Sequence, residues 1–275
     1  MSRLTKKLFL YGPYLPKHED NLMSSEGSVA LARENFITKR FRNLDALLRL
    51  RYEWMNKYLS PEKVIIEVGS GAGLSPLYLT YKPTLTDAAC NSWIDKVIDA
   101  TNMEIDSDSV DVLIASHNIH HFYSPYKFFT ECERVLRKDG VVLIQELNTS
   151  LMLRALLRVM RHEGWSYDVD VFDKNCYCND KNDLWSANCA VPEMLFTDST
   201  AFEHTFTNFK IESNELCECL IFPLSGGVIS KAPVPEFPRF LLRAILSFDQ
   251  LLVKLAPRIF AMGRRVVIRK REEAR

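Results

Sequence analysis

Three glycines at alternate positions follow a short apolar run and form the clearest candidate for a binding loop. The apolar run is Val64–Val68, and the loop Gly69–Gly73 comes directly after it. Glycines at this spacing let the backbone turn sharply and approach a ligand without an intervening Cβ atom. A buried strand, such a loop and a helix beginning near Pro76 favour a nucleotide-like ligand over a tight turn that binds nothing.

The position of the last glycine restricts the ligand. A dinucleotide fingerprint, GxGxxG, would place its third glycine at position 74, where this chain has Leu74. The loop therefore reads GxGxG, which suits a ligand that lacks a pyrophosphate. An NAD-dependent oxidoreductase on the same layout is the alternative, and Leu74 counts against it.

Side chains that can accept a proton follow two later apolar runs. His120 and His121 come after Val110–Ala115, and Glu146 comes after Val141–Ile144. Open α/β sheets bind ligands at the carboxyl ends of their strands, and an unperturbed imidazole titrates near neutral pH. The sequence therefore predicts His121 as a general base, with Glu146 as a second catalytic candidate. The alternative is that the two histidines only cap the strand.

The elements that position these residues alternate between strands and helices. Apolar runs predict strands at 64–68, 84–87, 97–99, 110–115, 141–144, 206–211, 216–222 and 265–269. Helical spacing predicts helices at 29–58, 125–136 (closed by Gly140), 151–161 and 238–260. This alternation is typical of a doubly wound α/β sheet. Only 11 residues separate Asp87 from Asp99, which is too few for a helix between the second and third strands.

Length and composition limit the class of protein. The 275 residues are 47% hydrophobic, and 35 basic residues balance 35 acidic ones. This excludes a disordered chain or a small disulfide scaffold, and a net charge of zero gives no reason to expect nucleic acid as partner. The run at residues 8–15 is too short for a signal peptide, so the seven cysteines are expected as free thiols in a cytoplasmic protein. Nothing in the sequence indicates the oligomeric state.

Four motifs within residues 60–150 resemble those of class I S-adenosylmethionine-dependent methyltransferases. They are the loop motif beginning at Glu67, the stretch 99–113, the segment 117–122 and the segment 133–140, where Lys138-Asp139 stands in place of the usual Pro-Gly. The resemblance implies a Rossmann-like, seven-stranded doubly wound sheet with a last strand near 265–270. It also implies S-adenosylmethionine as cofactor.

The resemblance implies roles for individual residues. Glu67 would orient the amino group of the methionine moiety, Asp87 would bind the ribose hydroxyls, and Asp99 would accept a hydrogen bond from the adenine amino group. The other residues implied to contact the cofactor are Gly69, Ser70, Gly71, Gly73, Ala100, Met103, His117 and Asn118. A loop at 91–93, in place of the missing helix, is expected close to the adenosine.

A narrower resemblance concerns the acceptor. Segments 188–196 and 223–227 look like parts of a methyltransferase branch found with polysaccharide or glycolipid genes. We therefore expect a small or lipid-linked acceptor, with a sugar hydroxyl as the methylated group. The expected organisation is an arm and helical cap (1–59), a cofactor-binding core (60–150), an acceptor-side insertion after strand five (151–240) and a C-terminal helix and strand (241–275). A non-catalytic S-adenosylmethionine-binding module is the alternative, and the intact motif residues count against it.

The cysteines offer a rival interpretation of the insertion. Cys176, Cys178, Cys189, Cys217 and Cys219 could gather around zinc with His162 or His204. Structural zinc sites usually use C-x₂₋₄-C spacing, whereas these pairs are C-x-C. Alternation along a strand would also place such a pair on one face as core filler. We therefore assign no metal ligand from the sequence.

The charge is distributed unevenly, and this directs attention to the C-terminal helix. Residues 163–219 hold 12 acidic and 3 basic side chains, and residues 231–275 hold 11 basic and 4 acidic ones. Within 238–260 the polar stripe is Arg239, Arg243, Ser247, Gln250, Lys254 and Arg258, and the apolar stripe is Leu241, Ile245, Phe248, Leu252, Leu255 and Ile259. Such a helix either packs on the sheet or lies on a membrane surface. Packing on the sheet is the first interpretation of this helix. Peripheral membrane contact through 238–260 is the second.

Overall fold

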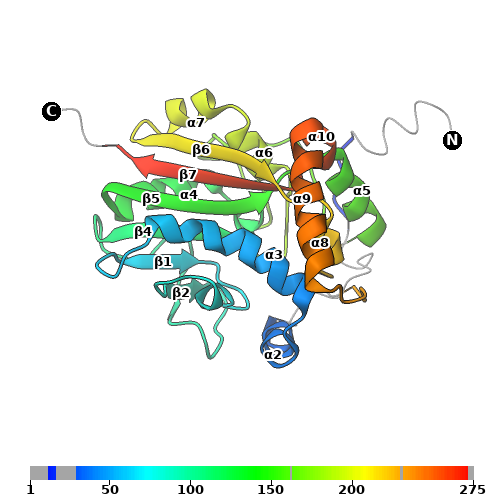
Figure 1. The fold of residues 1–275 in the computed structure, drawn as a ribbon. Coiled ribbons are helices and arrows are strands. Elements are labelled where there is room, and N and C mark those ends of the chain that lie inside the picture. The colour runs from blue at the N-terminus through cyan, green and yellow to red at the C-terminus, as the bar shows by residue number, and fades with distance from the viewer. Residues whose placement is uncertain (1–11, 17–28, 162, 230–231, 272–275) are drawn as a thin grey trace.

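A seven-stranded mixed sheet forms the centre of the protein (Figure 1). The computed structural model describes residues 12–16, 29–161, 163–229 and 232–271. The strands are β1 (Ile65–Val68), β2 (Thr84–Asp87), β3 (Lys96–Val97), β4 (Val110–Ser116), β5 (Leu136–Leu147), β6 (Phe209–Cys217) and β7 (Gly263–Lys270). Their order is β3-β2-β1-β4-β5-β7-β6. The pairs β5-β7 and β7-β6 are antiparallel, and the other neighbouring pairs are parallel. This order confirms the Rossmann-like class I methyltransferase sheet.

Helices cover both faces of the sheet. The longer helices are α2 (Val29–Lys39), α3 (Arg42–Tyr52), α4 (Pro125–Val135), α5 (Leu151–Met160) and α9 (Arg239–Leu255). The shorter ones are η2 (Glu53–Tyr58), η3 (Ser75–Leu77), η4 (Ile119–His121), α6 (Val191–Phe196), α7 (Ser199–Thr205), α8 (Ile221–Leu224) and α10 (Pro257–Phe260). None of the helices that the structure describes has the length and apolar character needed to cross a bilayer.

The period of two along each strand divides the core between the two faces. On β4, Leu113 belongs to a cluster with Phe128 and Phe129 of α4, whereas Ile114 packs with Leu44 and Leu47 of α3. Helices α4, α6 and α7 therefore cover one face, and α3 and α9 contribute to the other. The central strands β1 and β4 and the second half of β5 are buried on both sides, which explains why their sequences are largely apolar, whereas the edge strands β3 and β6 are partly exposed.

Several predicted elements differ from the structure. The predicted helix 29–58 is divided into α2, α3 and the 3₁₀ helix η2, and Arg40, between α2 and α3, has a positive φ of 48°. The predicted helix after the glycine loop is only the 3₁₀ turn η3, because ten residues between Gly73 and Thr84 must both leave and re-enter the sheet. The runs 206–211 and 216–222 are one strand, β6, followed by α8, because Asn214 does not interrupt the strand: its side chain donates to the carbonyl of Phe196 (2.6 Å). The predicted helix 238–260 is divided between α9 and α10 at Ala256, before Pro257.

The end of α4 also differs in detail. The helix ends at Val135, and β5 begins at Leu136, so Gly140 lies inside the strand rather than at a helix stop. The residue with positive φ is Asp139 (61°). The predicted insertion 151–240 contains β6, an edge strand of the central sheet. It also exchanges two backbone hydrogen bonds with the N-terminal arm, between Tyr14 and Trp165 (2.8 and 2.6 Å).

Candidate active site

The glycine loop leaves β1 with all three glycines in the left-handed region. The φ angles are 58° at Gly69, 50° at Gly71 and 58° at Gly73. A Cβ atom at Gly69 would lie 2.7 Å from Nδ2 of Asn118, so a side chain is excluded there by contact. At Gly71 a Cβ atom would meet nothing within 4 Å. The loop is therefore tightly packed on one side and open on the other, as a cradle for a ligand must be.

Glu67 lies directly beneath the loop and is buried. Its carboxylate accepts hydrogen bonds from the hydroxyl groups of Tyr52 (3.4 Å) and Ser75. Its carbonyl oxygen accepts from the hydroxyls of Ser70 (3.2 Å) and Thr86 (2.9 Å). Burial raises the pKa of Glu67 to about 7, and the two hydroxyl donors oppose that shift in part. A cationic group of a ligand would restore the ionised form.

The raised pKa of Glu67 predicts that the folded protein becomes less stable as pH rises. The unfolded carboxyl ionises near 4.5 and the folded one near 7, so the folded state holds the proton more tightly between these values. The stabilisation is complete below about pH 4.5 and is lost as pH rises through about 7. A shift of this size corresponds to roughly 3 kcal/mol. The variant Glu67→Gln, which cannot ionise, should gain about that much relative to wild type between pH 4.5 and pH 8 in urea denaturation. Parallel pH profiles for the two proteins would contradict this interpretation.

Asp87, at the end of β2, faces the loop. Its Oδ2 accepts a hydrogen bond from the backbone N–H of Gly71 (2.8 Å), and Oδ1 accepts from that of Ala89 (2.8 Å). The segment after it contains no helix, as the short spacing predicted. The side chain of Trp93 returns to the loop, where its indole N–H donates to the carbonyl of Gly71 (2.9 Å).

The N-terminal cap is tied to the same loop by Arg33 of α2. Its guanidinium donates to the carbonyls of Ala72 (2.7 Å) and Gly73 (2.6 Å), and it lies 5.0 Å from the centre of the Trp93 ring. Arg33 and Trp93 therefore clamp the outer side of the loop. Arg33 was not predicted as a site residue, because it lies about forty residues before the loop and belongs to no motif.

Asp99, after β3, is exposed and is oriented by a local turn. Its Oδ1 accepts from the backbone N–H (2.8 Å) and the hydroxyl (2.7 Å) of Thr101. Ala100 and Met103 are buried beside it, and the Met103 N–H donates to Glu131 (2.7 Å). One carboxylate oxygen of Asp99 is thus held in place, and the other has no hydrogen bond among the described residues.

The turn after β4 carries two buried polar atoms without partners. His117 has a positive φ of 53°. Its Nε2 atom and the Oδ1 atom of Asn118 are buried and have no hydrogen-bond partner among the described residues. Burial holds the pKa of His117 well below its ordinary value, so the ring is neutral. Buried polar atoms of this kind usually have a partner, and a polar ligand beside the loop would supply one.

Glu146 fixes this turn from beneath. It is fully buried, and its carboxylate accepts from the backbone N–H groups of Asn118 (2.7 Å) and Ile119 (2.6 Å) and pairs with Nδ1 of His120 (2.8 Å). Burial alone would raise the pKa of Glu146, but the charge of His120 and its hydrogen bond keep it below the ordinary value. Glu146 is thus an ionised acceptor whose oxygens are already engaged.

His121 lies at the end of the same turn and reaches the insertion. Its Nδ1 is 3.1 Å from the carbonyl of Ser186, and its Nε2 is 3.7 Å from Oε1 of Glu163. Burial lowers the pKa of His121 to about 4, and the neighbouring His120 acts in the same direction. The ring is therefore neutral at pH 7. When Nδ1 carries the hydrogen and donates it to the carbonyl of Ser186, the lone pair is on Nε2.

A polar cavity of about 430 Å³ adjoins these two partners of His121. Both Glu163 and Ser186 line it, together with Asn179, Asp180 and Asp183. Hydroxyl groups, amides and carboxylates that converge on one cavity suit a ligand rich in hydrogen-bonding groups. The cavity is therefore formed by residues 163–187 of the predicted insertion together with Leu15 and Pro16 of the N-terminal arm.

The same cluster is where a metal ion would find ligands. Among the described residues, His120, His121 and Glu163 are the group of histidine, cysteine and acidic side chains whose ligand atoms all lie within 4.8 Å of one another. The cysteines named as a zinc set do not gather in this part of the chain, and all seven are free thiols. His162, the other predicted partner of that set, lies outside the described residues.

The comparison with known families agrees with this geometry. Residues 66–144 match the methyltransferase domain family. The match covers most of β1, all of β2–β4 and the greater part of β5. The protein is therefore an enzyme of the methyltransferase class, and its methyl donor is S-adenosylmethionine.

Comparisons with whole proteins add two similar structures. An S-adenosylmethionine-dependent methyltransferase from Archaeoglobus fulgidus is 18% identical, with a TM-score of 0.49, over 86% of this chain and 99% of its own. A geranyl diphosphate C-methyltransferase from Streptomyces coelicolor A3(2) is 11% identical, with a TM-score of 0.40, over 96% of this chain and 93% of its own. No curated protein matches the sequence.

The residues of this methyltransferase fit its cofactor. The open space beside Gly71, the buried carboxylate of Glu67 and the unpartnered atoms of His117 and Asn118 lie around one loop. The predicted cofactor residues are thus brought to the carboxyl ends of β1–β4. Glu163 was missed because nothing in its local sequence separates it from the other acidic residues of the insertion.

Proposed function

We propose that this methyltransferase methylates a hydroxyl group of a small or lipid-linked acceptor, with a sugar as the preferred class. The observation that supports this most is the neutral His121, which stands beside a polar cavity and directs its Nε2 toward Glu163 (3.7 Å). A hydroxyl must lose a proton when its oxygen is methylated, and a base is required for that step. Amine acceptors that are already neutral would not need one.

The cofactor-binding residues in this proposal are those around the glycine loop. The set is Glu67, Gly69, Ser70, Gly71, Gly73, Asp87, Asp99, Ala100, Met103, His117 and Asn118. S-adenosylmethionine supplies an electrophilic methyl group on a sulfonium. Glu67 pairs with the ammonium group, the loop backbone approaches the ligand closely at Gly71, and Asp87 and Asp99 receive hydroxyl and amino donors. Ordering of donor and acceptor in this way accounts for much of the rate of a displacement reaction.

The acid–base part of the proposal gives His121 and Glu146 different tasks. His121 accepts the acceptor proton at Nε2, and the charge of Glu163, whose Oε1 lies 3.7 Å from the same nitrogen, stabilises the imidazolium that forms. Glu146 has no exposed surface and already binds Asn118, Ile119 and His120. Its task is therefore to hold the turn, which places it as a positioning residue rather than as the second base that the sequence suggested.

Product formation from a panel of acceptors tests the proposal. Radiolabelled S-adenosylmethionine is incubated with hydroxyl sugars, polyprenyl-phosphate-linked sugars and simple amines. Label transferred to a sugar oxygen is the expected result, and label found only on amines or carbon would overturn it. Calorimetry with S-adenosylmethionine, its demethylated product and NAD⁺ completes the test, because an oxidoreductase would bind NAD⁺ and this enzyme should not.

Asp99 provides a prediction about the adenine side of the cofactor site. Asp99→Ala should weaken S-adenosylmethionine binding by roughly 10- to 100-fold, because a hydrogen bond to a charged group contributes about 1.5–3 kcal/mol. Asp99→Asn is the matched control, since an amide oxygen can still accept from Thr101 and preserve the turn. Calorimetry measures both. Affinity that stays at the wild-type value in Asp99→Ala would remove this residue from the cofactor site.

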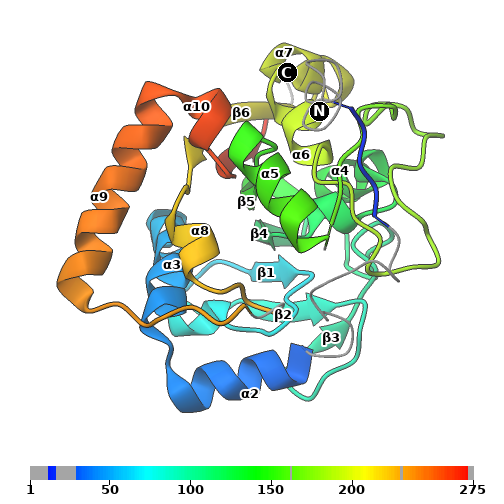
Figure 2. The same cartoon turned by 90° about the vertical axis from the view of Figure 1, so that its right-hand side faces the viewer.

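A lipid-linked acceptor requires the enzyme to reach a membrane. We infer a cytoplasmic enzyme, supported by seven free cysteines, that touches the membrane surface through residues 238–260. The same end of the sheet carries the glycine loop and α9 (Figure 1). Figure 2 shows the loops of the insertion on the opposite side of this end from α9, so an acceptor anchored in lipid at α9 would extend across the carboxyl ends of the strands to reach the cavity.

A further inference from the structure

Helix α9 has an exposed apolar face in addition to its packed face. Its buried residues are Leu242, Asp249 and Val253. Four large apolar side chains of α9 and one of α10 are instead exposed: Phe240 (73%), Phe248 (48%), Leu251 (49%), Leu255 (71%) and Ile259 (44%). On α9 their spacings of eight, three and four place them on one side of the helix. We call these five residues the apolar ridge.

The ridge is not the result of a loosely attached helix. The side chain of Asp249 accepts hydrogen bonds from the backbone N–H groups of Cys219 (3.2 Å), Leu220 (2.9 Å) and Ile221 (3.0 Å). A buried carboxylate with three such partners fixes the rotation of α9 about its axis. The apolar stripe expected from the sequence is therefore divided, so that Phe248, Leu255 and Ile259 face outward.

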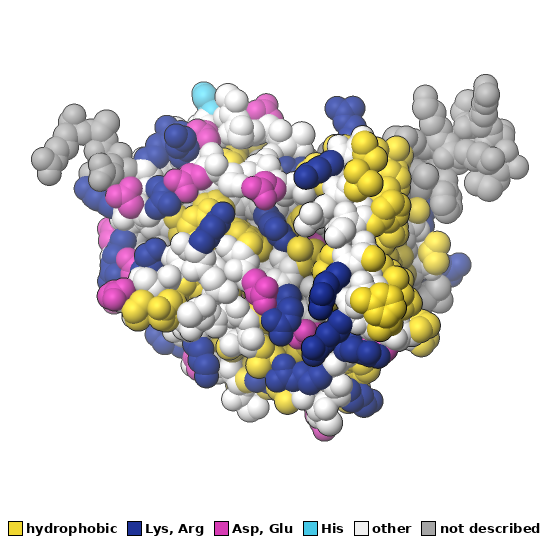
Figure 3. All heavy atoms as spheres, viewed as in Figure 1, with side chains coloured by type: hydrophobic (Ala, Val, Ile, Leu, Met, Phe, Trp, Pro, Cys, Tyr) yellow, Lys and Arg dark blue, Asp and Glu magenta, His cyan; other side chains and the backbone are white. Residues whose placement is uncertain are grey.

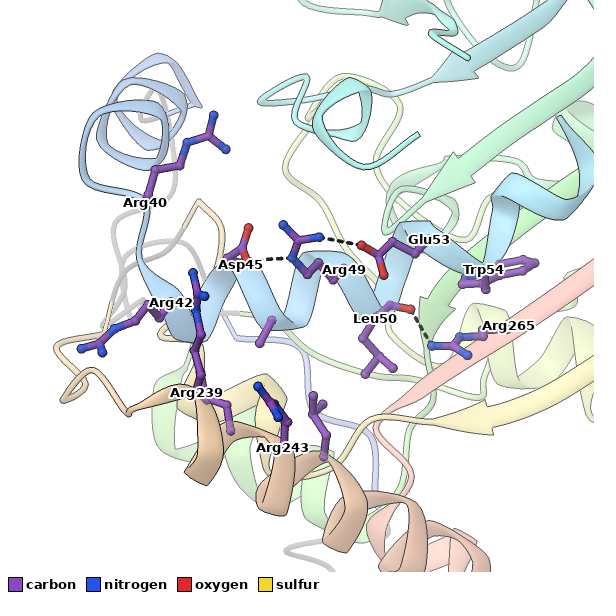
Figure 4. A pocket seen from close by; sticks show the side chains of 13 residues that line it. Arg40, Arg42, Asp45, Arg49, Leu50, Glu53, Trp54, Arg239, Arg243 and Arg265 are labelled. Atoms are coloured by element: carbon purple, nitrogen blue, oxygen red, sulfur yellow. Dashed lines mark hydrogen bonds and ion pairs between the residues drawn. The ribbon is translucent and has the colours of Figure 1, made fainter. Parts of the chain in front are cut away.

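A groove rich in arginine lies between α3 and α9 (Figure 4). It has a volume of about 710 Å³ and is lined by six arginines: Arg40, Arg42, Arg49, Arg239, Arg243 and Arg265. Two carboxylates, those of Asp45 and Glu53, also line it, and both bind Arg49 (2.9 and 2.7 Å). We call this set of arginines the arginine groove.

Four arginines of the groove form no ion pair with a carboxylate in the part of the chain that the structure describes: Arg40, Arg239, Arg243 and Arg265. Arg239 and Arg243 form no ion pair or hydrogen bond there, whereas Arg265 donates to the carbonyl of Leu50 (2.5 Å) and Arg42 lies 3.8 Å from Glu236. Several guanidinium groups gathered around one hollow repel one another unless an anion is present. The planar guanidinium matches phosphate geometry especially well.

The ridge and the groove lie side by side on one face of the molecule. Figure 3 shows the exposed hydrophobic side chains as a column along α9, with basic side chains directly beside it. On the helix, Arg239 and Arg243 stand next to the ridge residue Phe240. An amphipathic helix with basic residues beside exposed Leu and Phe is the arrangement of segments that lie in a lipid interface.

We propose that the apolar ridge and the arginine groove together dock the enzyme onto an anionic membrane. The ridge enters the boundary between headgroups and acyl chains, and the groove receives the phosphates of lipid headgroups. Charge complementarity identifies the occupant: the groove is strongly basic, and the acidic residues concentrate at 163–219, in the insertion. A neutral or cationic partner would leave Arg239 and Arg243 unpaired.

This inference rests on the membrane contact proposed above and deepens it by naming the docking surface and the charge of the lipid, and it fails separately from the methylation reaction. Vesicle binding is measured without donor or acceptor, so loss of membrane binding leaves the transfer of label to a soluble sugar unaffected. Conversely, an enzyme that binds vesicles and methylates only amines would keep the docking surface and lose the proposed acceptor.

Co-sedimentation of the full chain with vesicles tests the proposal. Vesicles of phosphatidylglycerol and phosphatidylcholine are compared with vesicles of phosphatidylcholine alone, at low and at high salt. We expect binding to the anionic vesicles at low salt, at least about tenfold weaker binding to the neutral ones, and a marked decrease at high salt.

Matched variants separate the two parts of the surface. Arg239→Gln with Arg243→Gln should weaken binding to anionic vesicles by roughly 10- to 30-fold, because each basic residue near the surface contributes about fivefold. Phe240→Ser with Leu255→Ser should weaken it by about tenfold or more at any salt concentration. The control, Lys96→Gln with Lys210→Gln, removes two exposed charges outside this face and should change binding by less than about twofold.

Four outcomes would overturn the proposal. The first is wild-type protein that remains in the supernatant with anionic vesicles at low salt. The second is a control variant that loses as much binding as the arginine variant. The third is a stable dimer without lipid that Phe240→Ser with Leu255→Ser dissociates, which would assign the ridge to a second copy. The fourth is calorimetric binding of tripolyphosphate without vesicle binding, which would assign the groove to a soluble anion.

Discussion

Gly71→Val is expected to abolish S-adenosylmethionine binding while the protein still folds. The backbone at Gly71 has a φ of 50°, which costs a residue with a Cβ atom roughly 1–2 kcal/mol. That strain is small compared with the stability of an ordinary domain, about 5–15 kcal/mol. A branched side chain would instead fill the space beside the loop, where no protein atom lies within 4 Å of the Cβ position.

The expected loss of affinity is large because the ligand approaches the backbone of the loop closely at Gly71. Calorimetry should detect no binding at concentrations at least about 100-fold above the wild-type dissociation constant, since an overlapping side chain excludes the ligand rather than weakening one contact. Circular dichroism checks that the variant is folded. Gly71→Asn is the control for strain, because asparagine tolerates positive φ. If Gly71→Asn also loses binding, the side chain is responsible; normal binding by Gly71→Val would contradict the cradle.

The part of this site that the sequence predicted consists of local signals. A strand buried on both faces must be apolar, and a turn with three positive φ angles favours glycine, so the segment from Val64 to Gly73 carries its structure in its composition. The missing helix after Asp87 follows from chain length alone. These features required no knowledge of distant contacts.

The contacts that join distant segments were not accessible in the same way. Arg33 reaches the glycine loop from α2, and Glu163 reaches His121 from the insertion. Neither residue differs in its local sequence from the other charged residues around it. Their positions depend on how the cap and the insertion pack against the core, which a single sequence does not specify.

The burial of Glu146 and the packed face of α9 could not be predicted from the spacing of residues in the sequence. The sequence places Glu146 just after a strand, whereas it lies within β5 at its carboxyl end, and its burial beneath Asn118 and His120 depends on a turn that only the structure reveals. Three residues of the single apolar stripe predicted over 238–260, Phe248, Leu255 and Ile259, are exposed in the structure rather than packed on the sheet. The buried residue Asp249 selects the packed face, because its three backbone partners lie at the start of α8.

The proposed base leads to the second prediction with a large effect. His121→Asn should lower turnover by about 10²–10⁴-fold and leave the affinity for S-adenosylmethionine unchanged. The asparagine amide can still donate to the carbonyl of Ser186, which His121 approaches at 3.1 Å, but it offers no basic nitrogen toward Glu163. His204→Asn, which changes an exposed histidine of α7, is the matched control and should keep full activity.

Turnover and cofactor affinity must be measured separately, because they distinguish a base from a structural residue. If His121→Asn loses turnover and cofactor affinity to the same extent, the ring supports the turn after β4 and is not the base. The pH profile gives an independent criterion. Burial lowers the pKa of His121 to about 4, so its lone pair is available throughout the neutral range, and no loss of turnover near pH 6 should be attributable to it. A metal requirement would also contradict the role of His121 as a base. If a chelator abolishes turnover and Zn²⁺ restores it, His120, His121 and Glu163 hold a metal ion instead.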